Sequence, residues 1–169
     1  CGLTREQDLA AAVAAGVDAV GAIVDVPVDT PRELSPDAAA DLFKTTPPFV
    51  TTVLVTMPDA VDRARQLVDR VEPDVLQIHD GVAPEGVVAL GEDVSVLAGV
   101  TNDEPDIEAY AAAADGLVVD TAGESGAGGT GRAHDWTATR DVGPLSAPIV
   151  LAGGLTPGNV AEAVSVVEP

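Results

Sequence analysis

The segment "DGLVVDT", residues 115–121, combines the pattern of a buried strand with a carboxylate at its end. Three consecutive apolar residues, 117–119, are typical of a strand that is covered on both faces, as in a parallel sheet. The run ends at Asp120, and the stretch "AGESGAGGTG" that follows is rich in glycine. A charge at the tip of a buried strand fits a functional position, and a helix-capping or turn aspartate is the structural alternative.

The same alternation of short apolar runs and helical spacing continues on both sides of this segment. Further strands are predicted at residues 17–24, 49–55, 74–79, 94–100 and 148–154. Helices are predicted from Thr4 to Gly16, and then at residues 35–43, 57–71, 84–90, 104–114, 135–142 and 156–167. Thr4 in "TREQ" and Ser35 in "SPDAAADLF" are the predicted helix caps. The alternation predicts βα units and a parallel sheet, led by a helix without its own strand.

Two architectures have this alternation. An open doubly wound sheet would normally show a glycine fingerprint after its first strand and an acidic residue near the end of its second, and the sequence has neither. A (β/α)8 barrel, the TIM barrel, places functional residues at the carboxyl ends of several different strands. The positions of Cys1, Arg32, His79, Asp120 and the pair Gly153-Gly154 agree with that arrangement. We therefore expect an α/β protein, a single (β/α)8 barrel domain over residues 1–169.

Composition narrows the class of protein. The 169 residues are 46% apolar, and 28 acidic residues against 8 basic ones give a net charge of −20. Nucleic acid is therefore not an expected partner, because no basic patch is available to neutralise phosphates. Such an acidic surface favours a salt-rich cytoplasm, where salt screens the repulsion; an ordinary acidic protein is the alternative. The single cysteine fits a reducing compartment, and no apolar run is long enough to span a bilayer, so a cytoplasmic protein without a membrane partner is expected.

Five blocks of the sequence resemble, in order and spacing, the signature blocks of phosphoribosylanthranilate isomerase, a family of tryptophan biosynthesis. They are "CGLTREQDLAAAVAAGVDAVGAI", "LQIHD", "DGLVVDT", "GGTGRAHDW" and "LAGGLTPGNVAEAV". The resemblance spans essentially the whole chain. It implies a (β/α)8 barrel that catalyses an Amadori rearrangement of N-(5-phosphoribosyl)anthranilate, a small phosphosugar, without a cofactor or a metal ion.

The resemblance also implies catalytic roles. The family's general base matches Cys1, and its general acid matches Asp120. A thiol acts as a base only where helix N-termini or cations favour the thiolate. The carboxyl group of Asp120 has to hold a proton at neutral pH, which burial at an apolar strand end would favour.

Substrate-binding residues are implied in the same way. Arg32 matches the arginine that we assign to the anthranilate carboxylate, with a solvated surface arginine as the alternative. His79 matches a histidine lining the substrate, with a packed, non-catalytic histidine as the alternative. Gln77 faces the same side as His79 by strand alternation and either contacts the same region or fills the barrel.

Glycines supply the remaining expected contacts. Gly129 lies in "GGTG", which resembles the family's mobile loop over the substrate, although a plain flexible loop has the same composition. Gly153 and Gly154 lie between a strand and a helix, where backbone N–H groups form an anion site, and we assign them to the phosphate.

The sequence departs from the family pattern in several places. Asp80 stands where the family has glycine, and His134 where it has phenylalanine. A first strand and a last βα unit are missing, so we expect a fragment of a longer protein that folds poorly or is inactive alone. Another phosphosugar barrel isomerase, which would use two aspartates, and an inactive barrel serving as a binding or assembly module are the alternatives. The oligomeric state, monomer or homodimer, stays open.

Overall fold

A computed structural model describes residues 1–120, 136–142 and 145–169 of the chain. Its six strands form one parallel sheet in which the spatial order follows the chain order. The strands are β1 (Ala19–Ile23), β2 (Thr51–Thr56), β3 (Val75–His79), β4 (Ser95–Thr101), β5 (Gly116–Asp120) and β6 (Ile149–Leu151). The helices are α1 (Glu6–Ala14), α2 (Pro36–Lys44), α3 (Val61–Val71), α4 (Pro84–Leu90), α5 (Ile107–Ala113), α6 (Trp136–Asp141) and α7 (Val160–Val167). Each predicted strand is confirmed.

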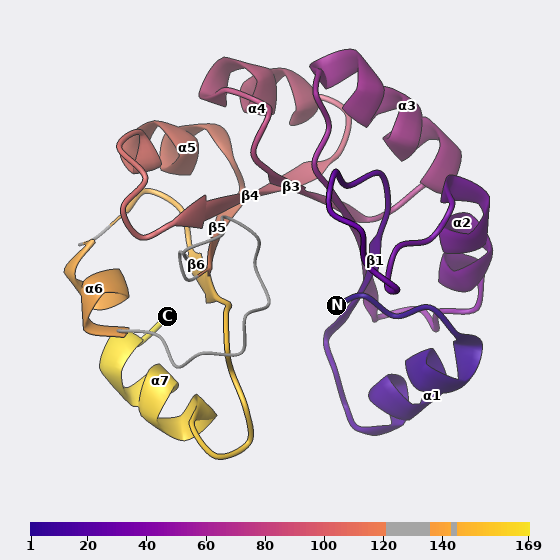
Figure 1. Ribbon diagram of the computed structural model, residues 1–169, viewed down its shortest axis with the longest axis horizontal. Coiled ribbons are helices and arrows are strands. Elements are labelled where there is room, and N and C mark those ends of the chain that lie inside the picture. Colours follow the sequence, from indigo (N-terminus) through magenta and orange to yellow (C-terminus); the bar gives the residue numbers. More distant parts are fainter. Residues whose placement is uncertain (121–135, 143–144) are drawn as a thin grey trace.

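The sheet bends into an arc with the helices around its outside (Figure 1). The strands lie on the inner side of this ring, and the ring is open on one side, between α1 and α7. A doubly wound sheet would carry helices on both faces. In the part of the chain that the structure describes, the helices lie on one face only, so the architecture is a six-stranded half-barrel.

Alternate residues of each strand divide between two faces of the sheet. One set packs under the helices and forms the main core: Ala22, Leu54, Leu76, Ile78 and Val96, joined by helix residues Leu67, Val87 and Leu90. Leu117 and Val119 of β5 belong to a second cluster on the same face. The intervening residues, among them Gln77, His79 and Asp120, therefore face the centre of the arc. We call this the concave face.

The two predicted helix caps have different outcomes. Ser35 caps α2 as predicted: its hydroxyl accepts a hydrogen bond from Ala38 N–H at 3.2 Å, and Pro36 occupies the first turn. The prediction that Thr4 caps α1 is wrong. The helix begins at Glu6, so Arg5 occupies the N-cap position, and no side chain caps it. Arg5 instead pairs with Asp8, at 2.8 Å, on the exposed surface.

These caps give a matched pair of variants. Ser35→Ala is expected to lower the free energy of unfolding by about 1 kcal/mol, because the Ala38 N–H loses its acceptor. Thr4→Ala is the control and is expected to change that free energy by less than about 0.5 kcal/mol. Denaturant titration measures both. Equal effects of the two changes would contradict the assignment of the caps.

Three helices begin later than the sequence pattern predicts. The predicted helices at 57–71, 104–114 and 156–167 begin at Val61, Ile107 and Val160. In the last of them, Thr156 O accepts from both Asn159 N–H and Val160 N–H, so a turn precedes the helix. The strands therefore end in longer loops than expected, all at the carboxyl end of the sheet. Within the described residues, no helix has both the length and the apolarity to cross a membrane.

Candidate active site

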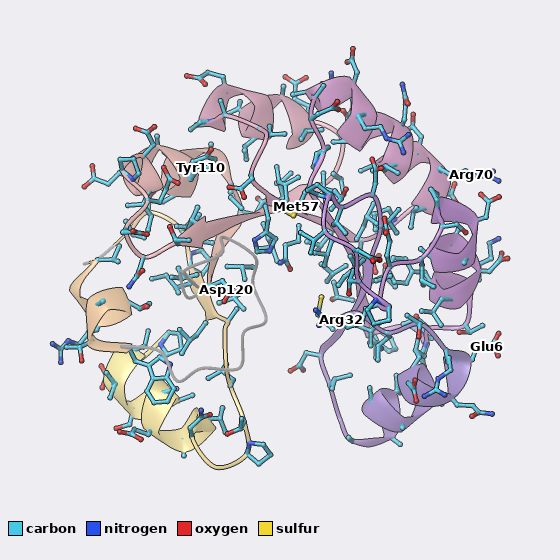
Figure 2. The ribbon with its side chains drawn as sticks, viewed as in Figure 1. Glu6, Arg32, Met57, Arg70, Tyr110 and Asp120 are labelled. Atoms are coloured by element: carbon cyan, nitrogen blue, oxygen red, sulfur yellow. The ribbon has the colours of Figure 1, made fainter. Side chains whose placement is uncertain are left out.

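Most of the predicted site residues that the structure describes lie at the carboxyl end of the parallel strands. His79 and Asp120 end β3 and β5, Arg32 lies in the loop between β1 and α2, and Gly153-Gly154 follows β6. Figure 2 shows Arg32 and Asp120 on opposite sides of the centre of the arc. The topology thus places side chains that are far apart in sequence around one central space.

Cys1 lies against the edge of β1. Leu3 N–H donates to Gly21 O at 3.0 Å, so the start of the chain runs beside this strand. A Cβ on Gly21 would lie 3.1 Å from Cys1 Sγ, which places the sulfur over the concave face, since Ala22 faces the helices. The thiol is free and exposed. Gly21 is therefore the residue that makes room for Cys1.

Arg32 lies beside the same segment. A Cβ on Gly2, whose φ is +75°, would lie 3.0 Å from Arg32 Cδ. The loop that carries Arg32 is attached to the neighbouring βα unit through Asp25. Arg63 Nε pairs with Asp25 Oδ2 at 2.7 Å, and the hydroxyl of Thr56 donates to Asp25 O at 3.2 Å. Arg63 and Asp25 are both partly exposed, so we regard this ion pair as positioning the loop more than as stabilising the fold.

Gln77 and His79 form a pair on the concave face, as strand alternation predicted. The side-chain amide nitrogen of Gln77 lies 2.5 Å from His79 Nε2. The imidazole ring rests on Gly99 of β4: a Cβ there would lie 2.5 Å from Cγ of the ring and closer still to Nδ1 and Cε1. Burial lowers the pKa of His79, opposed by the charges of Asp120 and Asp80.

Asp120 is half-buried at the end of β5 and is paired in register with Thr101. Its carboxylate is the first of the two charges that raise the pKa of His79 against the effect of burial. The central space is therefore bordered by a carboxyl group and a neutral imidazole on adjacent parts of one face. The protonation state and the catalytic role of Asp120 stay predictions.

Gly153 and Gly154 both have left-handed backbones, with φ of +84° and +61°. Asn159 bridges their loop: its amide donates to Gly154 O at 3.0 Å and its carbonyl accepts from Thr156 N–H at 2.6 Å. The pair lies between β6 and α7, as the sequence predicted, but a turn separates it from the helix, because α7 begins only at Val160. The loop itself, held by Asn159, is thus the candidate anion site, and phosphate binding there stays a prediction.

The departure at Asp80 has a conformational explanation. Asp80 has φ of +54° and is followed by Gly81 at +76°, so both residues are in the left-handed region. Aspartate tolerates this region better than most residues, and glycine adopts it without strain. This explains why the family pattern has glycine at the position.

The backbone at Asp80 leads to a stability prediction. Asp80→Gly is expected to unfold with a free energy about 1 kcal/mol higher than Asp80→Ala, since only alanine has a Cβ that opposes positive φ. Both variants remove the same charge, so the comparison isolates the backbone. Thermal and urea unfolding of the two proteins measure it. Equal stability would mean that the loop does not hold this conformation in solution.

Two residues of interest cannot be placed. Gly129, predicted in a loop over the substrate, and His134, the second departure from the family pattern, lie outside the described residues. Among the residues that are described, no group of three or more His, Cys, Asp and Glu side chains is arranged to hold a metal ion.

A recess of about 320 Å³ lies at the other end of the strands, and its lining includes Phe43, Pro47, Phe49 and Val71. It adjoins Thr52 and Asp74, at the amino ends of β2 and β3. The candidate site is at the carboxyl ends, so this recess is separate from it.

Sequence reasoning missed several residues that shape the site: Gly21, Gly99, Asn159, and the pair Asp25 and Arg63. A signal for two of them was available. A glycine inside a strand pattern often marks a close approach of another group, and both Gly21 and Gly99 lie inside predicted strands. No sequence pattern indicates that Asp25 lies next to Arg63, or that Asn159 bridges the loop after β6.

A parallel α/β arc that gathers polar side chains at the carboxyl ends of its strands is the arrangement of (β/α) barrel enzymes. The family model described as N-(5'phosphoribosyl)anthranilate (PRA) isomerase matches residues 1–169. The chain therefore belongs to the N-(5'-phosphoribosyl)anthranilate isomerase family.

Individual relatives agree with this assignment. An N-(5'-phosphoribosyl)anthranilate isomerase of Haloferax volcanii is 55% identical and matches 100% of this chain and 78% of its own length. The crystal structure of phosphoribosyl anthranilate isomerase from Thermus thermophilus is 27% identical, with a TM-score of 0.84, over 98% of this chain and 80% of that one. Another, solved in complex with reduced 1-(o-carboxyphenylamino)-1-deoxyribulose 5-phosphate, is 28% identical with a TM-score of 0.81, over 100% and 81%. The halophilic relative agrees with the acidic composition.

Proposed function

We propose that this chain catalyses the Amadori rearrangement of N-(5'-phosphoribosyl)anthranilate to 1-(2-carboxyphenylamino)-1-deoxyribulose 5-phosphate. The observation that carries the proposal is the family match over residues 1–169. It is supported by the related structure that holds a reduced form of this product. The location of Cys1 and Asp120 on one concave face supports it further.

The reaction needs one proton donor and one proton acceptor. Asp120 donates a proton to the furanose ring oxygen as the bond from that oxygen to C1 breaks, and the nitrogen lone pair forms the C1=N bond of an open-chain protonated imine. The thiolate of Cys1 then takes the proton from C2, and the electrons of the C–H bond form the C1=C2 bond of a neutral enolamine. As the enolamine becomes the ketone, C1 gains a proton and the C2 hydroxyl loses one, which returns Cys1 and Asp120 to their starting protonation states. No other reactant is consumed.

The remaining residues bind the two ends of the substrate. Arg32 pairs with the anthranilate carboxylate, for which a guanidinium offers two parallel donors. The left-handed backbone at Gly153 and Gly154 turns N–H groups toward the phosphate. His79 and Gln77 line the sugar region between these ends.

We further propose that the six-stranded arc is part of an eight-stranded (β/α)8 barrel, in one domain that acts in the cytoplasm. The carbonyl groups of Gly21 and Ile23, on the edge of β1 that faces away from β2, accept hydrogen bonds from Leu3 and Leu34. The edge of β1 at which a closed barrel would add a strand therefore already forms backbone hydrogen bonds with other segments. The monomeric and homodimeric states stay open.

The test is turnover of N-(5'-phosphoribosyl)anthranilate in molar salt, by residues 1–169 and by the whole natural reading frame in parallel. Formation of the ketose phosphate by the reading frame is the expected result. Turnover of a histidine-pathway aldose phosphate instead would support the rival isomerase. Binding of the reduced product without turnover would support the binding module. Either outcome would overturn the proposal.

A further inference from the structure

The contact between Gln77 and His79 favours one position for the imidazole proton. The amide nitrogen of Gln77 faces His79 Nε2, and an amide nitrogen only donates hydrogen bonds, so the contact is a hydrogen bond in the tautomer in which Nε2 accepts. An accepting Nε2 has no proton. The neutral ring therefore carries its proton on Nδ1.

The surroundings keep the ring neutral and fixed in place. The Nδ1–Cε1 edge lies over Gly99, where any side chain would overlap it. Burial lowers the pKa of His79, and a donor at Nε2 also disfavours protonation there. At neutral pH the ring is thus an uncharged donor through Nδ1.

The edge of the ring that carries the proton is directed across the sheet. Gly99 is paired with His79 on one side and with Val118 of β5 on the other. The Nδ1 edge, above Gly99, is therefore on the side of the ring that faces β5 and Asp120. Of the described residues, the charged groups that act on His79 are Asp120, from β5, and Asp80, from its own strand end.

We propose that Gln77 is a positioning residue that holds His79 in the neutral tautomer protonated on Nδ1, so that an N–H donor faces the space between His79 and Asp120. This rests on the proposed function and replaces the simple lining role predicted for Gln77. The donor hydrogen-bonds a substrate oxygen at that place, while the ring, being neutral, adds no positive charge of its own beside the carboxyl group of Asp120.

A spectroscopic experiment tests the tautomer without any assay of turnover. The chain has two histidines, so ¹⁵N imidazole spectra contain two spin systems, and the variant His134→Asn identifies that of His79. The expected spectrum shows a protonated Nδ1 in the parent. In Gln77→Leu the proton is expected to redistribute to Nε2. A parent ring protonated on Nε2, or an unchanged tautomer in Gln77→Leu, would overturn the proposal even if the isomerase activity is as proposed.

Gln77→Glu adds a pH readout. A carboxylate at position 77 accepts from Nε2–H and favours the imidazolium, so His79 should titrate at higher pH in Gln77→Glu than in the parent, with Gln77→Leu between them. The pH at which the ¹⁵N shifts of His79 titrate is measured in the three proteins. An unmoved His79 titration in Gln77→Glu with a fully retained fold would contradict the positioning role. Absence of turnover in the parent would instead count against the proposed function.

Discussion

Cys1→Ala and Asp120→Asn are each expected to lower kcat/KM for N-(5'-phosphoribosyl)anthranilate by at least about a hundredfold, the low end of acid and base catalysis. Alanine cannot take the proton from C2, and an amide cannot give one to the ring oxygen. Cys1 is exposed and Asp120 is half-buried at a strand end, so neither change should remove the core. Steady-state kinetics in molar salt measure the effect.

The control for these variants is Asp41→Asn. Asp41 is an exposed carboxylate on α2 that pairs with Lys44 and lies away from the concave face. Its loss removes one negative charge, as Asp120→Asn does, and is expected to leave kcat/KM within about twofold of the parent. If the parent is active and kcat/KM of neither Cys1→Ala nor Asp120→Asn falls well below that of Asp41→Asn, both assigned roles are wrong.

Gly99→Ala is expected to destabilise the protein by about 1 to 3 kcal/mol, the usual cost of forcing a methyl group into a filled space. The new Cβ would overlap the His79 ring, which would have to leave its place between Gln77 and β4. The value of kcat/KM for Gly99→Ala should also fall by at least about tenfold, because the displaced ring of His79 no longer faces Asp120. Chemical unfolding and kinetics on the same protein measure both effects.

A matched glycine and a double variant make this prediction specific. Gly91→Ala is the control: its Cβ would have no contact shorter than 3.4 Å, and its φ of −63° suits alanine. We expect unchanged or slightly higher stability there. In the His79→Ala background, Gly99→Ala should cost at least about 1 kcal/mol less than in the parent, since the two residues are in contact. Additive costs would show that the ring does not rest on Gly99.

The strands and their order could be predicted from sequence because each carries its signal locally. A run such as Leu117–Val119 is apolar on both faces, and its βα neighbours repeat the pattern. The cap at Ser35 followed from a serine before a proline at a helix start. The same reasoning was wrong at Thr4, because a capping box is a tendency and Arg5 takes the cap position in the folded chain.

The late start of α7 shows a second limit. Thr156 and Pro157 look like a helix start, but Asn159 uses its side chain to join Thr156 and Gly154. That bridge holds a turn before the helix. Helix propensities describe single residues, so they do not include these hydrogen bonds between the Asn159 side chain and the backbone of the loop.

The sequence by itself determined the alternation of strands and helices, the acidic surface and the family. These follow from hydrophobic periodicity, composition and the order of motifs, which are properties of the sequence alone. Only the tertiary structure decided that Gly21 admits Cys1, that Gly99 admits the ring of His79, and that the side-chain amide of Gln77 contacts Nε2 of His79. The physical reason is that these contacts depend on strand register and on which face each residue occupies. They join segments that are brought together only when the sheet curves.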